Sequence, residues 1–204
     1  DPSLELVKII QSARFSKHDL CSEIIYEFPE LQGIMGGKYL KREGFSEDIS
    51  LAVAEHYLPR FYKDDLPSTK YGAITSLSDK LEMIISIYVI GKRPSGSSDP
   101  FALRRNLNGV IQIIWNFNFD LQIHKIIEKL LIFWSQSLKD YDFDQVNVLS
   151  ELILFVRQRV LSHLEETISY KDVIEATCAS DNISEERIFD IVDLKKRVNA
   201  LCAL

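Results

Sequence analysis

The spacing of apolar residues constrains the fold of this chain more than any other feature. From residue 70 to residue 90 they recur three or four positions apart and so share one face of a helix: Ala73, Leu77, Leu81, Ile84, Ile85 and Tyr88. The same kind of spacing predicts further helices over residues 4–13, 16–28, 46–57, 100–116, 121–138, 146–164, 170–179 and 184–204. No stretch alternates apolar and polar residues as a half-buried strand does. The sequence therefore predicts an all-α protein.

A turn-rich stretch, residues 91–105, separates two helical halves. Gly91, Pro94 and Gly96 end the helix that precedes it. Asp99 is expected to cap the next helix, and Pro100 to take its first position, where the missing N–H of proline costs nothing. We therefore expect one domain over residues 1–98 and a second over residues 99–204.

Basic side chains crowd this junction: Lys92, Arg93, Arg104 and Arg105. Because the start of a helix favours anions, phosphate is the natural ligand for four cations at this place. Arg60 is a further candidate, because it lies among aromatic residues, and single-stranded RNA sites combine cations with aromatic rings. The alternatives are a solvated loop before a well-capped helix, or cations that pair with acidic groups inside the fold.

Charge is unevenly distributed along the chain. The net charge is −6 over 204 residues, and residues 139–193 hold thirteen acidic against five basic side chains. A polyanion is expected to avoid that half of the chain and to bind near residues 92–105.

The three cysteines, Cys21, Cys178 and Cys202, are far apart in the sequence. Their spacing matches neither a disulfide framework nor a zinc site, which indicates buried thiols in a reducing compartment. No signal peptide or membrane span is visible.

Histidine and aspartate residues in the first half suggest ligands for a divalent metal. The pair His18 and Asp19, then His56, then Asp79, resembles the pattern of the HD phosphohydrolases, which are all-helical metal enzymes. Structural roles compete with this interpretation: Asp19 can complete a capping box begun by Ser16, and His56 can interact with the last carbonyls of a helix. We expect the four residues to be vestigial or structural and to hold no metal.

Other motifs of catalysis do not occur in the sequence. It contains neither a glycine-rich phosphate loop nor a Gly-x-Ser-x-Gly elbow. We expect no catalytic residue in this chain.

Several short blocks carry a resemblance to a known family. They are residues 27–33 (EFPELQG), 55–60 (EHYLPR), 65–67 (DLP), 79–81 (DKL), 90–91 (IG) and 99–105 (DPFALRR), with Pro94, Gly96 and Ser97 between the last two. In order and spacing they are similar to the β subunit of bacterial-type glycyl-tRNA synthetase. Residues 155–164, 172–174 and 197–201 resemble the helical region before that family's anticodon-binding domain. The resemblance implies a middle piece of a longer subunit.

The resemblance also implies a function. Members of that family form an α₂β₂ ligase that joins glycine to tRNA(Gly), with ATP and Mg²⁺ at a class II active site on the α subunit. The β subunit supplies tRNA recognition, and its middle holds an HD-like helical domain, here residues 1–98, before a helical body, here residues 99–204. The family usually has Ala where this chain has His18.

Under that reading the fragment holds no cofactor. It is expected to work with the α subunit, the remainder of the β subunit and tRNA, away from membranes, in the cytoplasm or an organellar stroma or matrix. The expected phosphate contacts are Arg60, Lys92, Arg93, Arg104 and Arg105, while Gly96, Asp99 and Pro100 set the geometry of the junction.

Two other functions stay open on the sequence. One is a metal-dependent HD-type nucleotide phosphohydrolase that uses His18, Asp19, His56 and Asp79. The other is a purely architectural helical module.

Overall fold

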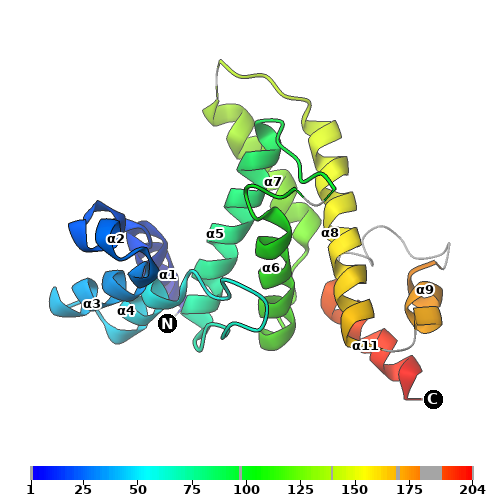
Figure 1. The fold of residues 1–204 in the computed structure, drawn as a ribbon, viewed down its shortest axis with the longest axis horizontal. Coiled ribbons are helices and arrows are strands. Elements are labelled where there is room, and N and C mark those ends of the chain that lie inside the picture. The colour runs from blue at the N-terminus through cyan, green and yellow to red at the C-terminus, as the bar shows by residue number, and fades with distance from the viewer. Residues whose placement is uncertain (1, 97, 139, 169–170, 180–189, 204) are drawn as a thin grey trace. The chain divides into compact units, whose positions relative to one another are not determined.

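The computed structural model describes residues 2–96, 98–138, 140–168, 171–179 and 190–203, with the side chains of residues 178 and 179 left outside the description. Within these ranges the regular structure is helical (Figure 1), which confirms the all-α prediction. The chain divides into two compact units, Asp1–Lys80 and Leu81–Leu204. This division falls inside helix α5 (Lys70–Val89), earlier than the boundary expected near residue 98, because a helix need not end where its packing partners change.

The first unit is built from short helices. They are α1 (Pro2–Phe15), η1 (His18–Cys21), α2 (Glu23–Glu27), η2 (Pro29–Leu31), α3 (Ile34–Arg42), α4 (Glu47–Glu55) and the first part of α5. The single helix predicted over residues 16–28 is therefore broken into two pieces. Ser16 does not cap it, because its hydroxyl donates back to the carbonyl of Ala13 at 2.9 Å.

Helices α3 and α4 pack closely, and the contact requires glycine. A Cβ at Gly37 would lie 2.5 Å from the carbonyl oxygen of Ser50 and 2.8 Å from the Cβ of Ala54. Glycine at this position thus allows a close approach between the two backbones. The core beside this contact consists of Leu40, Ile49 and Val53, with Phe15 and Phe45 packed against it.

The second unit contains the end of α5 and five further described helices: α6 (Leu103–Phe117), α7 (Ile123–Ser137), α8 (Gln145–Thr167), α9 (Lys171–Ala179) and α11 (Ile191–Cys202). Helix α8 contacts α6, α7 and α9, and α11 contacts α6 and α9 (Figure 1). The inner face of α6 is fully buried, at Leu107, Ile111 and Ile114 among others. The helix predicted over residues 184–204 is seen from residue 191, and residues 184–189 lie outside the described residues.

The prediction that the cysteines are buried is wrong for the two whose side chains are described. Cys21 is exposed and Cys202 is partly exposed, because both lie at helix ends. The side chain of Cys178 lies outside the described residues.

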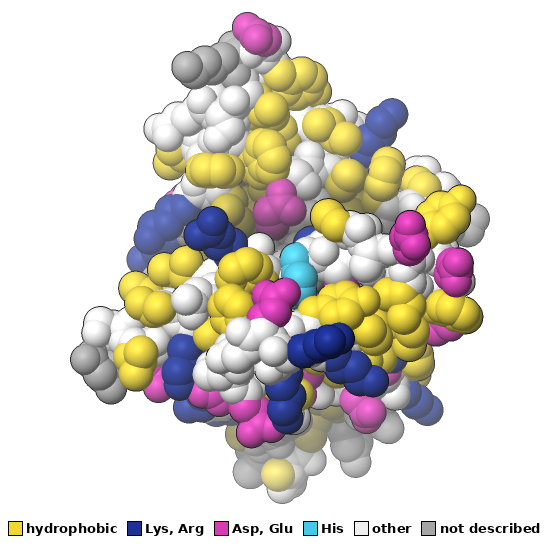
Figure 2. Space-filling view, turned by 90° about the vertical axis from the view of Figure 1, so that its left-hand side faces the viewer, with side chains coloured by type: hydrophobic (Ala, Val, Ile, Leu, Met, Phe, Trp, Pro, Cys, Tyr) yellow, Lys and Arg dark blue, Asp and Glu magenta, His cyan; other side chains and the backbone are white. Residues whose placement is uncertain are grey.

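Apolar side chains also reach the surface of the first unit. On α1 the side chains of Leu4, Val7 and Ile10 are about half exposed, and Tyr26 of α2 is 90% exposed. Figure 2 shows apolar groups interspersed with charged ones on the face that it presents. Among the helices that the structure describes, none is both long enough and apolar enough to span a membrane.

Candidate nucleic-acid interface

Asp99 fixes the start of α6. Its two carboxylate oxygens accept hydrogen bonds from the backbone N–H groups of Leu103 and Arg104, at 2.8 and 2.9 Å. Between Asp99 and Leu103, Ala102 turns the chain with a positive φ of 54°. The predicted cap is therefore present, but the helix begins at Leu103 and not at Pro100, because the carboxylate reaches past residues 100–102 to the first amides of the helix.

The loop before this cap is closed by a tight turn. The backbone N–H of Ser95 donates to the carbonyl of Ser98 at 3.0 Å, and the N–H of Ser98 donates back at 2.8 Å. Gly96 lies inside the turn with a φ of 49°, a conformation that favours glycine. Gly96 and Asp99 thus set the path of the chain from Arg93 to Arg104.

Three basic residues of the junction keep their charge available. Lys92 and Arg105 are exposed, and Arg104 is half-buried. Within the described part of the chain, none of these three side chains forms an ion pair with a carboxylate. The side chains of these three residues are therefore not paired with a carboxylate in the described part of the chain.

Arg93 has a different environment. Its Nε and Nη2 lie 2.5 Å from a carboxylate oxygen of Glu151 on α8, and its Nη1 donates to the carbonyl of Tyr88 at 2.6 Å. The guanidinium also lies over the Tyr88 ring, 4.1 Å from its centroid. Arg93 is therefore paired with an acidic group inside the fold, which is one of the alternatives that the sequence left open for the junction arginines.

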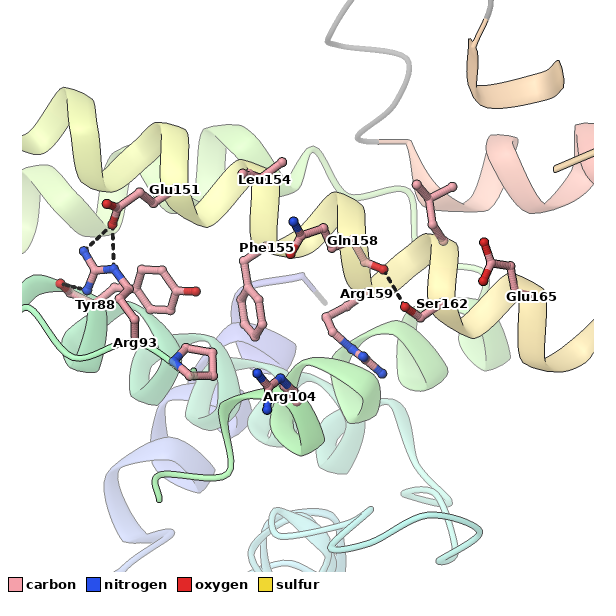
Figure 3. A pocket seen from close by; sticks show the side chains of 12 residues that line it. Tyr88, Arg93, Arg104, Glu151, Leu154, Phe155, Gln158, Arg159, Ser162 and Glu165 are labelled. Atoms are coloured by element: carbon pink, nitrogen blue, oxygen red, sulfur yellow. Dashed lines mark hydrogen bonds and ion pairs between the residues drawn. The ribbon is translucent and has the colours of Figure 1, made fainter. Parts of the chain in front are cut away.

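Two of these arginines line a pocket of about 610 Å³ in the second unit (Figure 3). The pocket lies along α8 and the start of α6, and it contains a third arginine, Arg159. The Arg159 Nε and Nη2 both donate to Oδ1 of Asn108 on α6, each at 3.0 Å. The sequence analysis missed Arg159 because it lies in the acidic half of the chain, and only the packing of α8 against α6 brings it to the junction.

Arg60 belongs to the first unit and lies in the loop between α4 and α5. Its backbone N–H and its Nε both donate to Oδ2 of Asp64, at 2.8 and 3.1 Å. Burial acts to raise the pKa of Asp64, but the hydrogen bonds and charge of Arg60 outweigh it and hold this pKa below its ordinary value. The Arg60 side chain is 45% exposed, so its charge still faces solvent.

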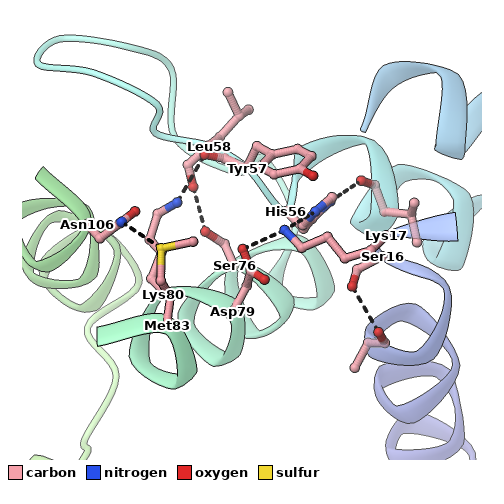
Figure 4. Close-up of polar contacts among 12 residues, drawn as sticks. Ser16, Lys17, His56, Tyr57, Leu58, Ser76, Asp79, Lys80, Met83 and Asn106 are labelled. Carbon is pink, nitrogen blue, oxygen red and sulfur yellow. Dashed lines mark hydrogen bonds and ion pairs between the residues drawn. The ribbon is translucent and has the colours of Figure 1, made fainter. Parts of the chain in front are cut away.

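Two residues of the HD-like pattern, His56 and Asp79, contact a lysine that the sequence analysis did not single out. The ammonium of Lys17 lies 2.9 Å from Oδ2 of Asp79 and 3.1 Å from Nε2 of His56 (Figure 4). It also lies over the face of the Tyr57 ring, 3.9 Å from its centroid. A cation is thus already bound by the imidazole and the carboxylate that the metal interpretation requires.

Asp19 supports the backbone of α3. Its carboxylate is fully buried, and Oδ2 accepts hydrogen bonds from the N–H groups of Gly33 and Gly36, at 2.7 and 3.1 Å. It therefore caps α3 from a distance instead of completing a capping box with Ser16, as one interpretation of the sequence proposed. Oδ1 of the same carboxylate has no hydrogen-bond partner among the described residues.

His18 is oriented by backbone and aromatic contacts. Its Nδ1 lies 2.5 Å from the carbonyl oxygen of Phe15, and its ring contacts the edges of Phe15 and Tyr39. Among the described residues no group of three or more His, Cys, Asp or Glu side chains is arranged to hold a metal ion. The position of Lys17 gives the physical reason at His56 and Asp79, since a divalent cation there would have to displace the ammonium.

Burial controls the ionisation of His56. Desolvation, together with the charge of Lys17, lowers its pKa from 6.5 to about 4, against the opposing influence of the Val53 carbonyl, Asp79 and Asp19. Desolvation likewise raises the pKa of Tyr57 to about 12, assisted by the same two carboxylates. At neutral pH the cluster therefore contains a neutral imidazole beside a charged ammonium.

Comparison with known proteins identifies the family. A family described as "Glycyl-tRNA synthetase beta subunit" matches residues 3–179. The chain is 38% identical over 197 residues to the glycine–tRNA ligase beta subunit of Trichodesmium erythraeum, an alignment that covers 95% of this chain and 27% of the relative. It is 40% identical over 197 residues to that of Thermodesulfovibrio yellowstonii, covering 97% and 26%. For that of Clostridioides difficile the identity is 37% over 193 residues, covering 95% and 27%.

The chain belongs to the glycyl-tRNA synthetase β-subunit family. It spans 26–27% of the length of these relatives. The family resemblance predicted from the sequence blocks is thus confirmed, whereas the HD-like description of residues 1–98 stays a prediction.

Proposed function

We propose that this chain contributes tRNA binding and part of the subunit scaffold to a glycine–tRNA ligase. The observation that carries this proposal is a set of three cations in the junction, Lys92 after α5 and Arg104 and Arg105 in the first turn of α6, which have no carboxylate partner among the described residues. Cations that are not neutralised locally attract a polyanion and release its counterions. In a chain with a net charge of −6, this makes the junction the part best suited to tRNA phosphates.

The five predicted contacts are not equivalent in this proposal. Lys92, Arg104 and Arg105 bind phosphates directly. Arg60 forms an ion pair with Asp64, and Arg93 forms one with Glu151, so each attracts a tRNA phosphate less strongly.

Membership of the family supports the partners that we propose. The ligase consists of this subunit, including its other regions, and the α subunit, and it works in the cytoplasm. Glycine is attached to tRNA(Gly) with ATP and Mg²⁺ at the α-subunit active site. Nothing in this proposal gives the present chain a catalytic residue, and the Lys17 ammonium at His56 and Asp79 argues against phosphohydrolase chemistry there.

The test is a double substitution, Arg104→Ala with Arg105→Ala, in the assembled ligase. We expect weaker tRNA binding at low salt and a shallower dependence of affinity on salt, by roughly 0.7–0.9 in the logarithmic slope for each phosphate that the ligase no longer binds. Lys125→Ala with Lys129→Ala is the matched control, because it removes the same charge from exposed positions on α7.

Two results would count against tRNA binding by this junction. One is an unchanged affinity with an unchanged salt slope. The other is impaired assembly of the ligase with an unchanged slope, which would favour the architectural role.

A further inference from the structure

The pocket between α6 and α8 brings together two arginines that are distant in the sequence. Arg104 enters it from the first turn of α6, and Arg159 enters it from α8 (Figure 3). Asn108 follows Arg104 by one helical turn, so both residues lie on the same face of α6. Because Asn108 holds the guanidinium of Arg159, the two arginines are kept at the same side of the pocket.

No acidic group neutralises this pair within the described residues. Glu151, which also lines the pocket, is engaged by Arg93 at 2.5 Å. Glu165 lines the far end of the pocket and is exposed, without an ion pair to either arginine. Two guanidinium groups that face one cavity repel each other, and a bound anion relieves that repulsion.

The free N–H groups, the volume and the apolar wall of the pocket suit a phosphate that carries a sugar. The Nη1 of Arg159 stays available, since only Nε and Nη2 bind Asn108. A guanidinium presents its N–H groups in a planar fork that matches two phosphate oxygens. A volume of about 610 Å³ exceeds what one phosphate needs, and the exposed side chain of Leu154 offers an apolar wall beside it.

We propose that this pocket binds one backbone phosphate of the tRNA, held by Arg104 and Arg159 together. The inference rests on the proposed function, and it adds a defined binding position to the general attraction of the junction. It also assigns Asn108 as a positioning residue that orients Arg159.

The experiment compares Arg→Lys substitutions in the assembled ligase, because lysine keeps the charge and loses the planar fork. Arg104→Lys and Arg159→Lys are each expected to weaken tRNA binding about tenfold, and together by less than the product of the single effects, because both contact the same phosphate. The matched control is Arg157→Lys, which changes an exposed arginine next to the pocket residue Gln158 and is expected to leave the affinity almost unchanged.

A second variant leaves both arginines in place. Asn108→Asp keeps the shape of the side chain and puts a carboxylate against Arg159, so it should neutralise that guanidinium and weaken tRNA binding to a similar degree. Thermal unfolding of each variant checks that the fold is retained. Because Asn108→Asp adds an ion pair to the fold, a weaker affinity in this variant cannot be ascribed to a missing internal hydrogen bond.

The outcomes separate the two proposals. If Arg104→Lys, Arg159→Lys and Asn108→Asp all bind tRNA as tightly as the unmodified ligase, the pocket is not a phosphate site, whereas Arg104→Ala with Arg105→Ala still tests the junction as a whole. If the variants weaken the association of the subunits and leave tRNA affinity unchanged, the pocket binds an acidic group of a protein, and the inference is overturned.

Discussion

Lys17 donates a hydrogen bond to His56: its ammonium nitrogen lies 3.1 Å from Nε2 of the buried imidazole. An ammonium group can only donate, so Nε2 must accept, and the ring proton lies on Nδ1. That proton is donated to the carbonyl of Val53 at 2.6 Å. The pair therefore requires a neutral histidine, which agrees with a pKa lowered to about 4 by burial and by Lys17.

The first prediction concerns stability in acid. His56 is protonated at its ordinary pKa of 6.5 in the unfolded chain but only near pH 4 in the folded one, so unfolded chains bind more protons between these values. Above pH 6.5 the neutral His56 contributes about 3 kcal/mol to the free energy of unfolding. This contribution is lost as the pH falls toward 4. Urea unfolding across this range should show the loss, and His56→Gln should flatten the curve. Identical curves for the two proteins would contradict the assignment.

Lys17 itself can be tested through the titration of His56. Lys17→Met removes the positive charge and leaves the carboxylates of Asp79 and Asp19, both of which favour the protonated imidazole. The pKa of His56 should therefore rise, as followed by NMR of the ring. Lys17→Arg is the control, because it retains the charge, and it should leave the pKa closer to 4. A pKa that does not move in Lys17→Met would show that the ammonium is not bound where we describe it.

Asp19 is expected to stabilise the first unit through its carboxylate. Asp19→Ala leaves the buried N–H groups of Gly33 and Gly36 without an acceptor, which should lower the free energy of unfolding by roughly 2–4 kcal/mol. Asp19→Asn keeps one oxygen acceptor of similar shape and should cost less. Chemical denaturation at pH 7 measures both. Equal losses for the two variants would mean that the hydrogen bonds contribute little.

Gly37 is expected to tolerate no side chain. Gly37→Ala places a methyl group 2.5 Å from the Ser50 carbonyl oxygen, so α3 and α4 must move apart, at a cost of about 1–3 kcal/mol or more. Gly44→Ala is the comparison, because nothing lies within 4 Å of its Cβ and only its positive φ of 88° opposes the change. A smaller melting-temperature loss for Gly37→Ala than for Gly44→Ala would contradict the close packing.

Local sequence patterns predicted most helices, because the apolar spacing and the cap of a helix involve residues that are close together in the sequence. The stripe from Ala73 to Tyr88 defined α5, and Asp99 was recognised as a cap before the structure placed the first turn of α6 at Leu103. The start was displaced because Ala102 adopts a left-handed conformation, which no residue pattern announces.

Long-range contacts were beyond such patterns. Asp19 matched a capping box with Ser16, yet its partners lie at Gly33 and Gly36. Lys17 stands out in no sequence pattern, although its ammonium contacts His56 and Asp79. Spacing along the chain cannot reveal a contact that depends on how helices pack.

The junction between α5 and α6 combines a feature that the sequence predicts with contacts that it does not. Its cations were visible in the sequence, but which of them is already paired was not. Glu151 engages Arg93 from α8, and Arg159 joins Arg104 in the pocket from the same helix. Both relationships depend on the packing of α8 in the second unit.

The central claim is that the start of α6 contacts tRNA, and photo-crosslinking from position 105 tests it most directly. Arg105 is exposed, so a photoreactive amino acid can replace it without disturbing the core. In the assembled ligase, irradiation should join this position to tRNA(Gly), and high salt should reduce the yield. A crosslink to the α subunit alone, or none to tRNA when tRNA is saturating, would contradict the account.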